Sequence, residues 1–425
     1  MKQTSGFIST YSADAFGVCS ALYELGGMIV MHDASGCNST YTTHDEPRWY
    51  DMDSMVYISG LTEIEAIMGD DSKLINDISE AALELKPRFI AIVGTTIPAM
   101  TGFDAAAAAR EIEDRTGIPA FGFSTTGMRS YIHGAGMAFN ALAEHIIKMN
   151  PGIAEKNSEL VFCKDDSSAN DKGCSVETGK ENASGMNIIG LTPLDFSING
   201  SAGSIKELYE KKGYRIVSSW AMGSSPEEIE NAGTAGVNQV VSASGILAAS
   251  AMRDKLGIPY KIGIPIGNEE IDVTEECGML KDYKGGCLFR GEKGIGISMV
   301  ENAGAEYKNI HGDSIDVLIL GECVSSFSLA KFISKKTGKS CAAFSATEMY
   351  EDEIRELICD LNELRFIIAD PLYRGIFKLL PKELEESISF ISLPHEAFSG
   401  RMYRNDIPDL VRGEKWISDM LEKLR

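Results

Sequence analysis

Short apolar runs alternate with longer helical patterns along most of the sequence, and this alternation limits the fold more than any other feature. Two of the runs, FIAIVG at 89–94 and PAFGF at 119–123, flank a segment that has Asp104, then five alanines, then Gly117. Alanine is the best helix former, an aspartate before the first turn caps it, and glycine ends it. The segment therefore predicts strand, helix and strand in succession.

The alternation recurs in three successive units. Runs that are apolar at nearly every position are typical of strands covered by helices on both faces, so each unit predicts a parallel, doubly wound α/β sheet. In such sheets, ligands bind where the carboxyl ends of the strands meet. The expected strands are 28–31, 89–94 and 119–123 in the first unit, 186–191, 214–220, 237–243 and 258–264 in the second, and 316–321 followed by three more runs in the third.

Composition narrows the class of protein. The 425 residues carry 40 basic and 62 acidic side chains, a formal charge of −22. Such an acidic surface repels phosphate backbones, so nucleic-acid binding is not expected. No apolar run approaches the roughly 20 residues of a membrane span, and the first residues resemble no secretory signal. We therefore expect a cytoplasmic protein that does not bind membranes.

The cysteines do not indicate disulfides. There are nine of them, an odd number, and a framework of bridges is not expected in a chain of this length. Cys323, Cys341 and Cys359 lie on or beside expected strands and helices, where we expect them to fill the core.

The stretch 28–50 carries four possible metal ligands, His32, Asp33, Cys37 and His44. Imidazole, carboxylate and thiolate suit zinc or iron. The spacing of these residues matches no zinc motif, however. On these residues alone, the favoured interpretation is that His32 bonds to the loop backbone and that Cys37 is a buried thiol.

Two further polar segments follow expected strands. The segment 125–139, TTGMRSYIHGAGMAF, contains Arg129, His133 and three glycines. Such glycines allow either the close approach of a ligand or only close packing of a helix start. The segment 394–403, PHEAFSGRMY, places His395 directly after a strand. A helix cap explains this histidine as readily as a binding site does.

Taken in order, these motifs resemble the nitrogenase component 1 family. Its members typically have a strand ending in His-Gly-x-x-Gly-Cys, an acidic segment before a helix, then Lys-Pro, a strand and a Thr-Thr-Cys turn. This chain has HDASGC at 32–37, a matching segment over 60–96, and further similar segments at 213–267 and 316–339. The resemblance covers nearly the whole chain, and the residues of the first part that fit are Glu63, Gly69, Lys73, Leu74, Lys86, Pro87, Thr95 and Thr96.

The resemblance implies three Rossmann-like, doubly wound domains around a central cleft. We expect the first domain, with an amino-terminal segment near the cluster, over 1–160. The second is expected over 186–308, and the third, with a carboxyl-terminal helix, over 309–425.

The resemblance also implies an iron–sulfur cluster at a subunit interface, for which family subunits supply cysteine at about three places. Cys37 matches the Gly-Cys place and is the expected metal ligand. Ile97 stands at the Thr-Thr-Cys place, and near the first place the chain offers Ser12 or Asp14 instead of cysteine. Because a 4Fe–4S cluster normally takes four thiolates, a second subunit would have to complete it.

The function implied is that of an oxidoreductase subunit. It would accept electrons from an ATP-dependent iron–sulfur reductase and pass them through the cluster to a substrate or metallocofactor in the cleft. The residues expected to bind a cofactor there are His32, Arg129, His133 and His395.

The resemblance further implies a homologous partner subunit, in a homodimer, a heterodimer or a heterotetramer. The sequence has no GxxxxGK[ST] phosphate-binding loop, so ATP hydrolysis would belong to the reductase. The alternative is a non-catalytic scaffold, or a degenerate partner subunit, that binds a metallocofactor or a tetrapyrrole.

Overall fold

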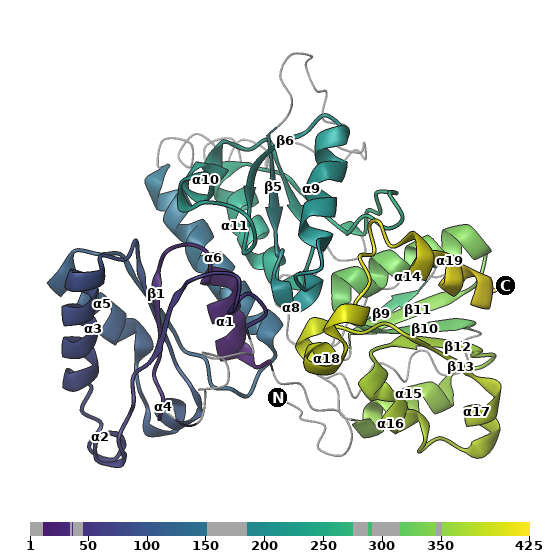
Figure 1. Ribbon diagram of the computed structural model, residues 1–425, viewed down its shortest axis with the longest axis horizontal. Coiled ribbons are helices and arrows are strands. Elements are labelled where there is room, and N and C mark those ends of the chain that lie inside the picture. Colours follow the sequence, from purple (N-terminus) through teal and green to yellow (C-terminus); the bar gives the residue numbers. More distant parts are fainter. Residues whose placement is uncertain are drawn as a thin grey trace, which may run out of the picture.

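The computed structural model describes residues 12–34, 36, 46–150, 185–274, 288–290, 315–345 and 351–425. Three α/β domains surround a common junction, with the first at the left of Figure 1, the second at the top and the third at the right. Each domain is built on one sheet flanked by helices. The prediction of three Rossmann-like, doubly wound domains is confirmed.

All three sheets share one strand order. In each sheet, the four parallel strands, counted in chain order, lie side by side as second, first, third, fourth. The orders are β2-β1-β3-β4, β6-β5-β7-β8 and, read from its other edge, β9-β11-β10-β12-β13, in which β9 is an additional edge strand. The connections reverse direction between the first and third strands, and such a switch point leaves a crevice at the carboxyl ends of the strands. The strands are β1 Met28–Met31, β2 Met55–Ile58, β3 Ile90–Val93, β4 Ala120–Phe123, β5 Gly185–Ile189, β6 Arg215–Ser219, β7 Val237–Val240, β8 Tyr260–Ile262, β9 Leu288–Arg290, β10 Val317–Gly321, β11 Cys341–Ser345, β12 Phe366–Ala369 and β13 Ser389–Ser392.

The first sheet buries both faces, as its apolar strands predict. In β1, Met28 and Val30 pack with the helices α3 (Ser72–Leu85) and α5 (Ala105–Thr116). The alternate residues Ile29 and Met31 belong to the larger core that contains α1 (Asp14–Leu22) and α6 (Tyr131–Met149). Side chains alternate between the faces of a strand, so one continuous apolar run serves two helical layers.

Two glycines let α1 and α6 cross with their backbones in contact. A Cβ atom on Gly17 would lie 2.0 Å from the carbonyl oxygen of Tyr131, and one on Gly134 would lie 1.8 Å from that of Asp14. No other residue fits at either position without moving a helix. The crossing fixes the start of α1 against the start of α6.

Sequence signals define many of the helix ends. The carboxylate of Asp104 accepts a hydrogen bond from the N–H of Ala107 at 2.9 Å, and Gly117 ends α5 with a φ of +70°. The remaining helices of four residues or more are α2 Glu63–Met68, α4 Thr96–Thr101, α8 Pro193–Phe196, α9 Ser201–Lys211, α10 Pro226–Glu230, α11 Ile246–Leu256, α14 Cys323–Thr337, α15 Glu351–Asp360, α16 Arg374–Phe377, α17 Lys382–Ser387, α18 Glu396–Tyr403 and α19 Glu414–Lys423, together with the 3₁₀ turn η2 Asn231–Thr234.

A buried arginine joins the first domain to the second. Arg48 donates from Nη1 to Oε1 of Glu24 at 2.9 Å and to the carbonyl of Ala221 at 2.9 Å. Its Nε donates to Oε1 of Glu46 at 2.6 Å. The second oxygen of Glu24 accepts the N–H of Gly223 at 2.7 Å. One guanidinium thus satisfies two carboxylates and a carbonyl of the neighbouring domain.

Three details differ from expectation. The edge strand β2 was not among the expected strands, and β9 pairs antiparallel with β11, so the third sheet is not wholly parallel. Cys323 and Cys341 are buried as expected, but Cys359 is exposed, because it lies on the outer side of α15. The limits at 1–160, 186–308 and 309–425 stay predictions, and β9 joins the third sheet from within the second range.

Within the part of the chain that the structure describes, no helix has the length and apolar character required to cross a bilayer.

Candidate functional site

Threonines tie together the loops at the carboxyl edge of the first sheet. Thr95, after β3, donates from Oγ1 to the carbonyl of His32 at 2.8 Å. Thr125, after β4, donates from Oγ1 to the carbonyl of Gly94 at 2.6 Å. The ends of three neighbouring strands therefore form one connected edge, which contains the switch point between β1 and β3.

Asp14 fastens the start of α1 to this edge. Its carboxylate accepts backbone N–H groups from Gly127 at 2.7 Å, from Ala15 at 2.8 Å and from Thr126 at 3.1 Å. The side chain is buried, and both of its oxygens are engaged. Asp14 holds the turn after β4 in place, which is a structural role visible in the geometry.

The structure brings Ser12, Arg129 and His133 to the same place. A β-bridge between Ala13 and Ser130 lays the segment before α1 against the start of α6. Ser12 is buried, and its hydroxyl has no hydrogen-bond partner among the described residues. Arg129 is exposed, and its Nη1 lies 3.2 Å from Nε2 of His133 on the first turn of α6.

His32 lies at the end of β1, on the face covered by α3. Its Nδ1 lies 2.9 Å from Oγ of Ser59, and its ring centroid is 4.5 Å from that of Phe103. Burial lowers the pKa of His32 to about 4, although the charge of Glu65 acts in the opposite sense. The imidazole is therefore neutral at physiological pH.

His395 lies where the three domains meet. It precedes α18 in the third domain, and its Nε2 is 3.5 Å from Oδ1 of Asp195 in the second. The same oxygen accepts the hydroxyl of Tyr131, from the first domain, at 2.5 Å. Thr192 donates to the other oxygen at 3.0 Å. Burial alone lowers the pKa of His395, but the nearby carboxylate of Asp195, with the charges of Asp370 and Glu322, outweighs this effect and the pKa is raised.

Two buried carboxyl groups flank this contact at the switch point of the third sheet. Glu322, after β10, accepts the N–H of Ala243 of the second domain at 2.9 Å and that of Ser325 at 2.8 Å. Burial, helped by the charge of Asp195, raises the pKa of Glu322 to about 7. Asp370, after β12, accepts the backbone N–H of His395 at 2.9 Å, and burial raises its pKa as well.

The junction is nearly closed. A cavity of about 50 Å³ remains beside Asp195 and His395, with Ser325 on its wall. Glu396, next to His395, accepts the hydroxyl of Ser197 at 2.7 Å. Both ring nitrogens of His395 are shielded from solvent, and neither forms a hydrogen bond with a described residue. The junction thus holds an imidazole and several carboxyl groups in little space.

Comparison with known proteins identifies the family. The sequence model of nitrogenase component 1 type oxidoreductases matches residues 14–275, which is well over half of the chain. The chain belongs to this family. The match includes the carboxyl edge of the first sheet and all of the second sheet.

Two curated relatives support the assignment. The chain is 28% identical over 203 residues to the nitrogenase molybdenum–iron protein alpha chain of Methanosarcina barkeri, covering 47% of this chain and 32% of that protein. It is 25% identical over 205 residues to the nitrogenase iron–molybdenum cofactor biosynthesis protein NifE of Clostridium pasteurianum, covering 48% of this chain and 38% of that protein. The matched part therefore spans only about a third of either relative.

Solved structures of nitrogenase Cp1 share the fold. The structure determined at pH 5 has a TM-score of 0.50 and 14% sequence identity, over 93% of this chain and 78% of that one. The structure at pH 6.5 has a TM-score of 0.50 and 15% identity, over 100% and 74% of the two chains. At this identity the comparison supports the three-domain architecture and nothing finer.

Membership of this family suggests an iron–sulfur cluster. The possible metal ligands among the described residues cannot hold one by themselves. Among the described residues, no group of three or more His, Cys, Asp or Glu side chains could hold a metal ion. Ile97 is the second residue of α4, and its side chain has no atom that could ligate iron. The carboxylate of Asp14 is engaged by backbone N–H groups. Cys37, the predicted ligand, lies outside the described residues. A cluster at this edge would require thiolates from a second subunit.

The sequence interpretation found His395 but missed its neighbours. Asp195, Glu322 and Asp370 each follow an apolar strand within six residues, so an acid at the carboxyl end of a strand was the available signal. Tyr131 gave no signal, because a tyrosine in the first turn of a helix is usually part of the core.

Proposed function

We propose that this chain is an oxidoreductase subunit of the nitrogenase component 1 type, located in the cytoplasm. It accepts electrons from an ATP-dependent iron–sulfur reductase, and an interface iron–sulfur cluster passes them to a substrate or metallocofactor held between the domains. The observation that carries the proposal is the junction of Tyr131, Asp195 and His395, which joins the carboxyl ends of three sheets in a chain of this family.

The residues of the junction suit a reduction, because reductions take up protons together with electrons. Glu322 has a pKa of about 7, and Asp195 favours the protonated form of His395. Groups that titrate near neutral pH exchange protons most readily under working conditions. In this proposal, His395 and Glu322 hold protons at the junction, and Tyr131 fixes the carboxylate of Asp195 beside the imidazole.

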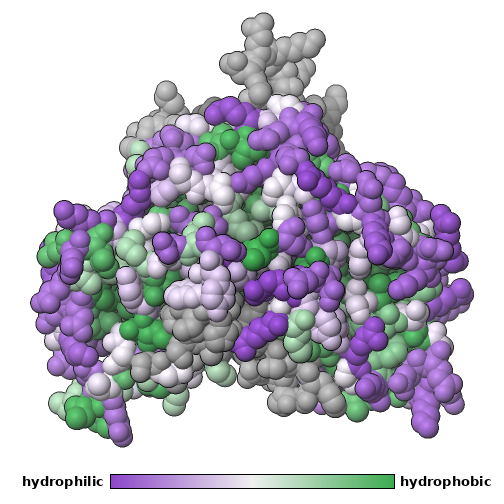
Figure 2. Space-filling view, in the orientation of Figure 1, coloured by the Kyte–Doolittle hydropathy of each residue, from purple (hydrophilic) through white to green (hydrophobic). Residues whose placement is uncertain are grey.

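An exposed apolar patch supports a homologous partner subunit. In α2 no residue is buried, and its side chains Ile64, Ile67 and Met68, with Met100 of α4, are 73% to 83% exposed. Figure 2 shows hydrophobic surface at the lower left, where α2 lies in Figure 1. Patches of this kind commonly mark protein interfaces. The patch borders the carboxyl edge of the first sheet at Ala34 and Ile97, so a partner there could supply the missing thiolates.

The second candidate function is a non-catalytic scaffold, or a degenerate partner subunit, for a metallocofactor or tetrapyrrole. The observation that favours it is the lack of donors: Ile97 cannot ligate iron, and both oxygens of Asp14 are engaged. In that case the junction binds a ligand without transferring electrons to it.

The two functions are separated by anaerobic purification of the complex from its native host, followed by iron analysis and EPR spectroscopy. We expect iron and a cluster signal that Cys37→Ala removes. The matched control is Cys359→Ala, because Cys359 is exposed in the third domain, and this variant should keep the signal. An iron-free complex, or a signal unchanged in Cys37→Ala, would refute the oxidoreductase proposal and leave the scaffold.

A further inference from the structure

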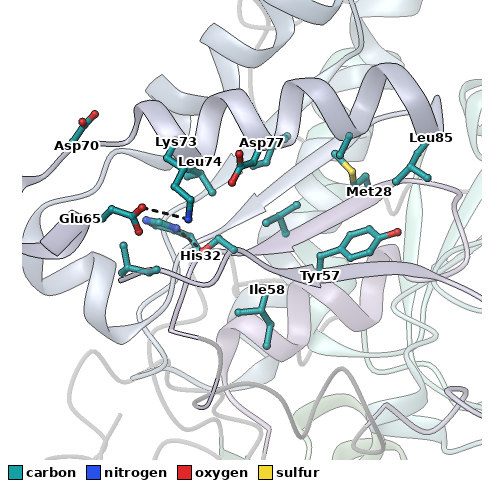
Figure 3. Close-up of a pocket in the computed structure, with 15 residues that line it drawn as sticks. Met28, His32, Tyr57, Ile58, Glu65, Asp70, Lys73, Leu74, Asp77 and Leu85 are labelled. Atoms are coloured by element: carbon teal, nitrogen blue, oxygen red, sulfur yellow. Dashed lines mark hydrogen bonds and ion pairs between the residues drawn. The ribbon is translucent and has the colours of Figure 1, made fainter. Parts of the chain in front are cut away.

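A pocket of about 270 Å³ lies in the first domain, between α3 and the strands β1 and β2. Figure 3 shows it as an elongated space roofed by α3. We call it the α3 pocket. It lies apart from the three-domain junction, and the function proposed above makes no use of it.

The strand order explains why the pocket exists. β2 is an edge strand. The buried residues of α3 and α5 pack with those of β1 and β3, whereas Met55 of β2 is only partly buried against them. On β1, the residues that face the pocket are Met28, Val30 and His32, which are two positions apart as the alternation of a strand requires. At about 3.3 Å per residue, these three side chains span about 13 Å. The pocket is therefore long enough for a short chain molecule.

One end of the pocket is apolar. Met28 and Leu85 lie at this end in Figure 3, with Tyr57 of β2 beside them. Tyr57 is 42% exposed and Leu85 is 44% exposed, so this end is open to solvent. The floor and roof of the pocket are also apolar, because Val30 of β1 and Ile78 of α3 both line it and belong to one core cluster. A hydrocarbon chain would bury apolar surface along this whole length.

The other end is polar and contains one buried polar side chain, His32. His32 is 4% exposed, and its Nδ1 is engaged by Ser59. Its Nε2 has no hydrogen-bond partner among the described residues, and Figure 3 shows the ring beside the ion pair of Glu65 and Lys73. Because the imidazole is neutral and Nδ1 faces a hydroxyl, Nε2 can accept a hydrogen bond from a donor in the pocket when Nδ1 carries the proton.

The charges on the wall favour a cation. Three carboxylates, Glu65, Asp70 and Asp77, line the pocket against one ammonium group, Lys73. The pKa values of Glu65 and Asp70 are lowered, mainly by hydrogen bonds to Thr62 and Ser72 respectively, so both are ionised. Asp77 has no ion-pair or hydrogen-bond partner in the described part of the chain. The excess negative charge would repel a carboxylate ligand and attract an ammonium group.

We propose that the α3 pocket binds a small amphipathic amine. The alkyl or aryl part lies along β1 between Met28 and Val30, and the ammonium group lies near Asp77, because both oxygens of Glu65 are already engaged by Lys73 and Thr62. There it donates a hydrogen bond to Nε2 of His32. The ligand is of fragment size, since drug-sized ligands occupy pockets of about 300 to 1,000 Å³.

The test compares three probes of equal length: octylamine, 1-octanol and octanoate. Each is titrated into the full chain at pH 7.5 and followed by calorimetry and by histidine-selective ¹³C NMR. We expect octylamine to shift the His32 signal and to bind more tightly than octanol, with octanoate weakest. Ala81→Phe fills the apolar part and should abolish binding of all three.

Charge variants locate the ammonium group. Asp77→Asn should weaken octylamine about threefold to fivefold, as expected for a partly exposed ion pair, and should leave octanol unchanged. The octanol result shows that the pocket is intact in each variant. Glu80→Gln removes the same charge from α3 outside the pocket and is expected to change neither affinity.

The proposal is overturned if octanoate binds as tightly as octylamine, if Asp77→Asn leaves the affinity for octylamine unchanged, or if no probe moves the His32 signal. These outcomes do not depend on iron or on a partner, so the proposal stands or fails separately from the oxidoreductase function.

Discussion

The depressed pKa of His32 gives a quantitative prediction. Burial lowers this pKa from 6.5 to about 4 in the folded chain, whereas the unfolded chain keeps the ordinary value. Between these two pH values the unfolded chain binds more protons than the folded one, so the folded state loses stability as the pH falls. The stability contributed by the neutral imidazole is complete above pH 6.5 and is lost as the pH falls toward 4.

The magnitude follows from the same two values. One pKa unit corresponds to about 1.4 kcal/mol, so the full effect is about 3 kcal/mol below pH 4. The sequence pI is about 4.8, and a chain near its pI associates. A practical range is therefore pH 7.5 to 5.5, over which the expected loss from His32 is about 1 kcal/mol.

Two measurements check this prediction. Histidine-selective ¹³C NMR follows the pH titration of the six histidines, and His32→Gln assigns the His32 signal by removing it. Denaturant unfolding of His32→Gln and of the unaltered chain at pH 7.5 and 5.5 then gives the free energy of unfolding of each protein. The contributions of the other titrating groups cancel when the two pH dependences are compared. A His32 signal that titrates near 6.5, or an equal loss of stability in both proteins, would show that this reasoning is wrong.

Three other substitutions have defined outcomes, and two of them have a matched control variant. Arg48→Ala leaves carboxylates buried without their cation and should lower the free energy of unfolding by about 3 to 5 kcal/mol. Arg88→Ala breaks an exposed ion pair and should leave the free energy of unfolding almost unchanged in the same denaturant assay. Gly134→Ala forces α1 and α6 apart and should reduce the melting temperature, while Gly203→Ala, in an open part of α9, should raise it slightly. Asp195→Asn removes the charge beside the histidine of the junction, and NMR titration should show the pKa of that histidine falling; an unchanged pKa would mean that Asp195 does not control it.

Much of the fold was predictable because it depends on local signals. Asp104 and Gly117 mark the ends of α5 by side-chain capping and by a left-handed backbone, and both act within one helical turn. The apolar strands are equally local. β2 was missed because it is an edge strand whose pattern is only partly buried, with Tyr57 exposed. β9 was missed because a three-residue strand has too little pattern to recognise.

The site was only partly predictable, because its contacts join residues far apart in the chain. The order of motifs pointed to the family and to His395, but the contact of that histidine with Asp195 spans two domains. The bond between Arg48 and Ala221 joins residues 173 positions apart. No periodicity in one sequence reports such pairs. His32 was identified correctly as the end of a strand, but the pocket beside it depends on how α3 lies over the sheet.

The contact of Tyr131, Asp195 and His395 has a consequence for assembly, because no domain contains more than one of the three residues. The contact therefore forms only when all three domains are docked against one another. We expect low concentrations of denaturant to uncouple Asp195 from His395 before any sheet is lost. Any molecule that binds at the junction would stabilise the docking of all three domains at once, because it would contact each of them.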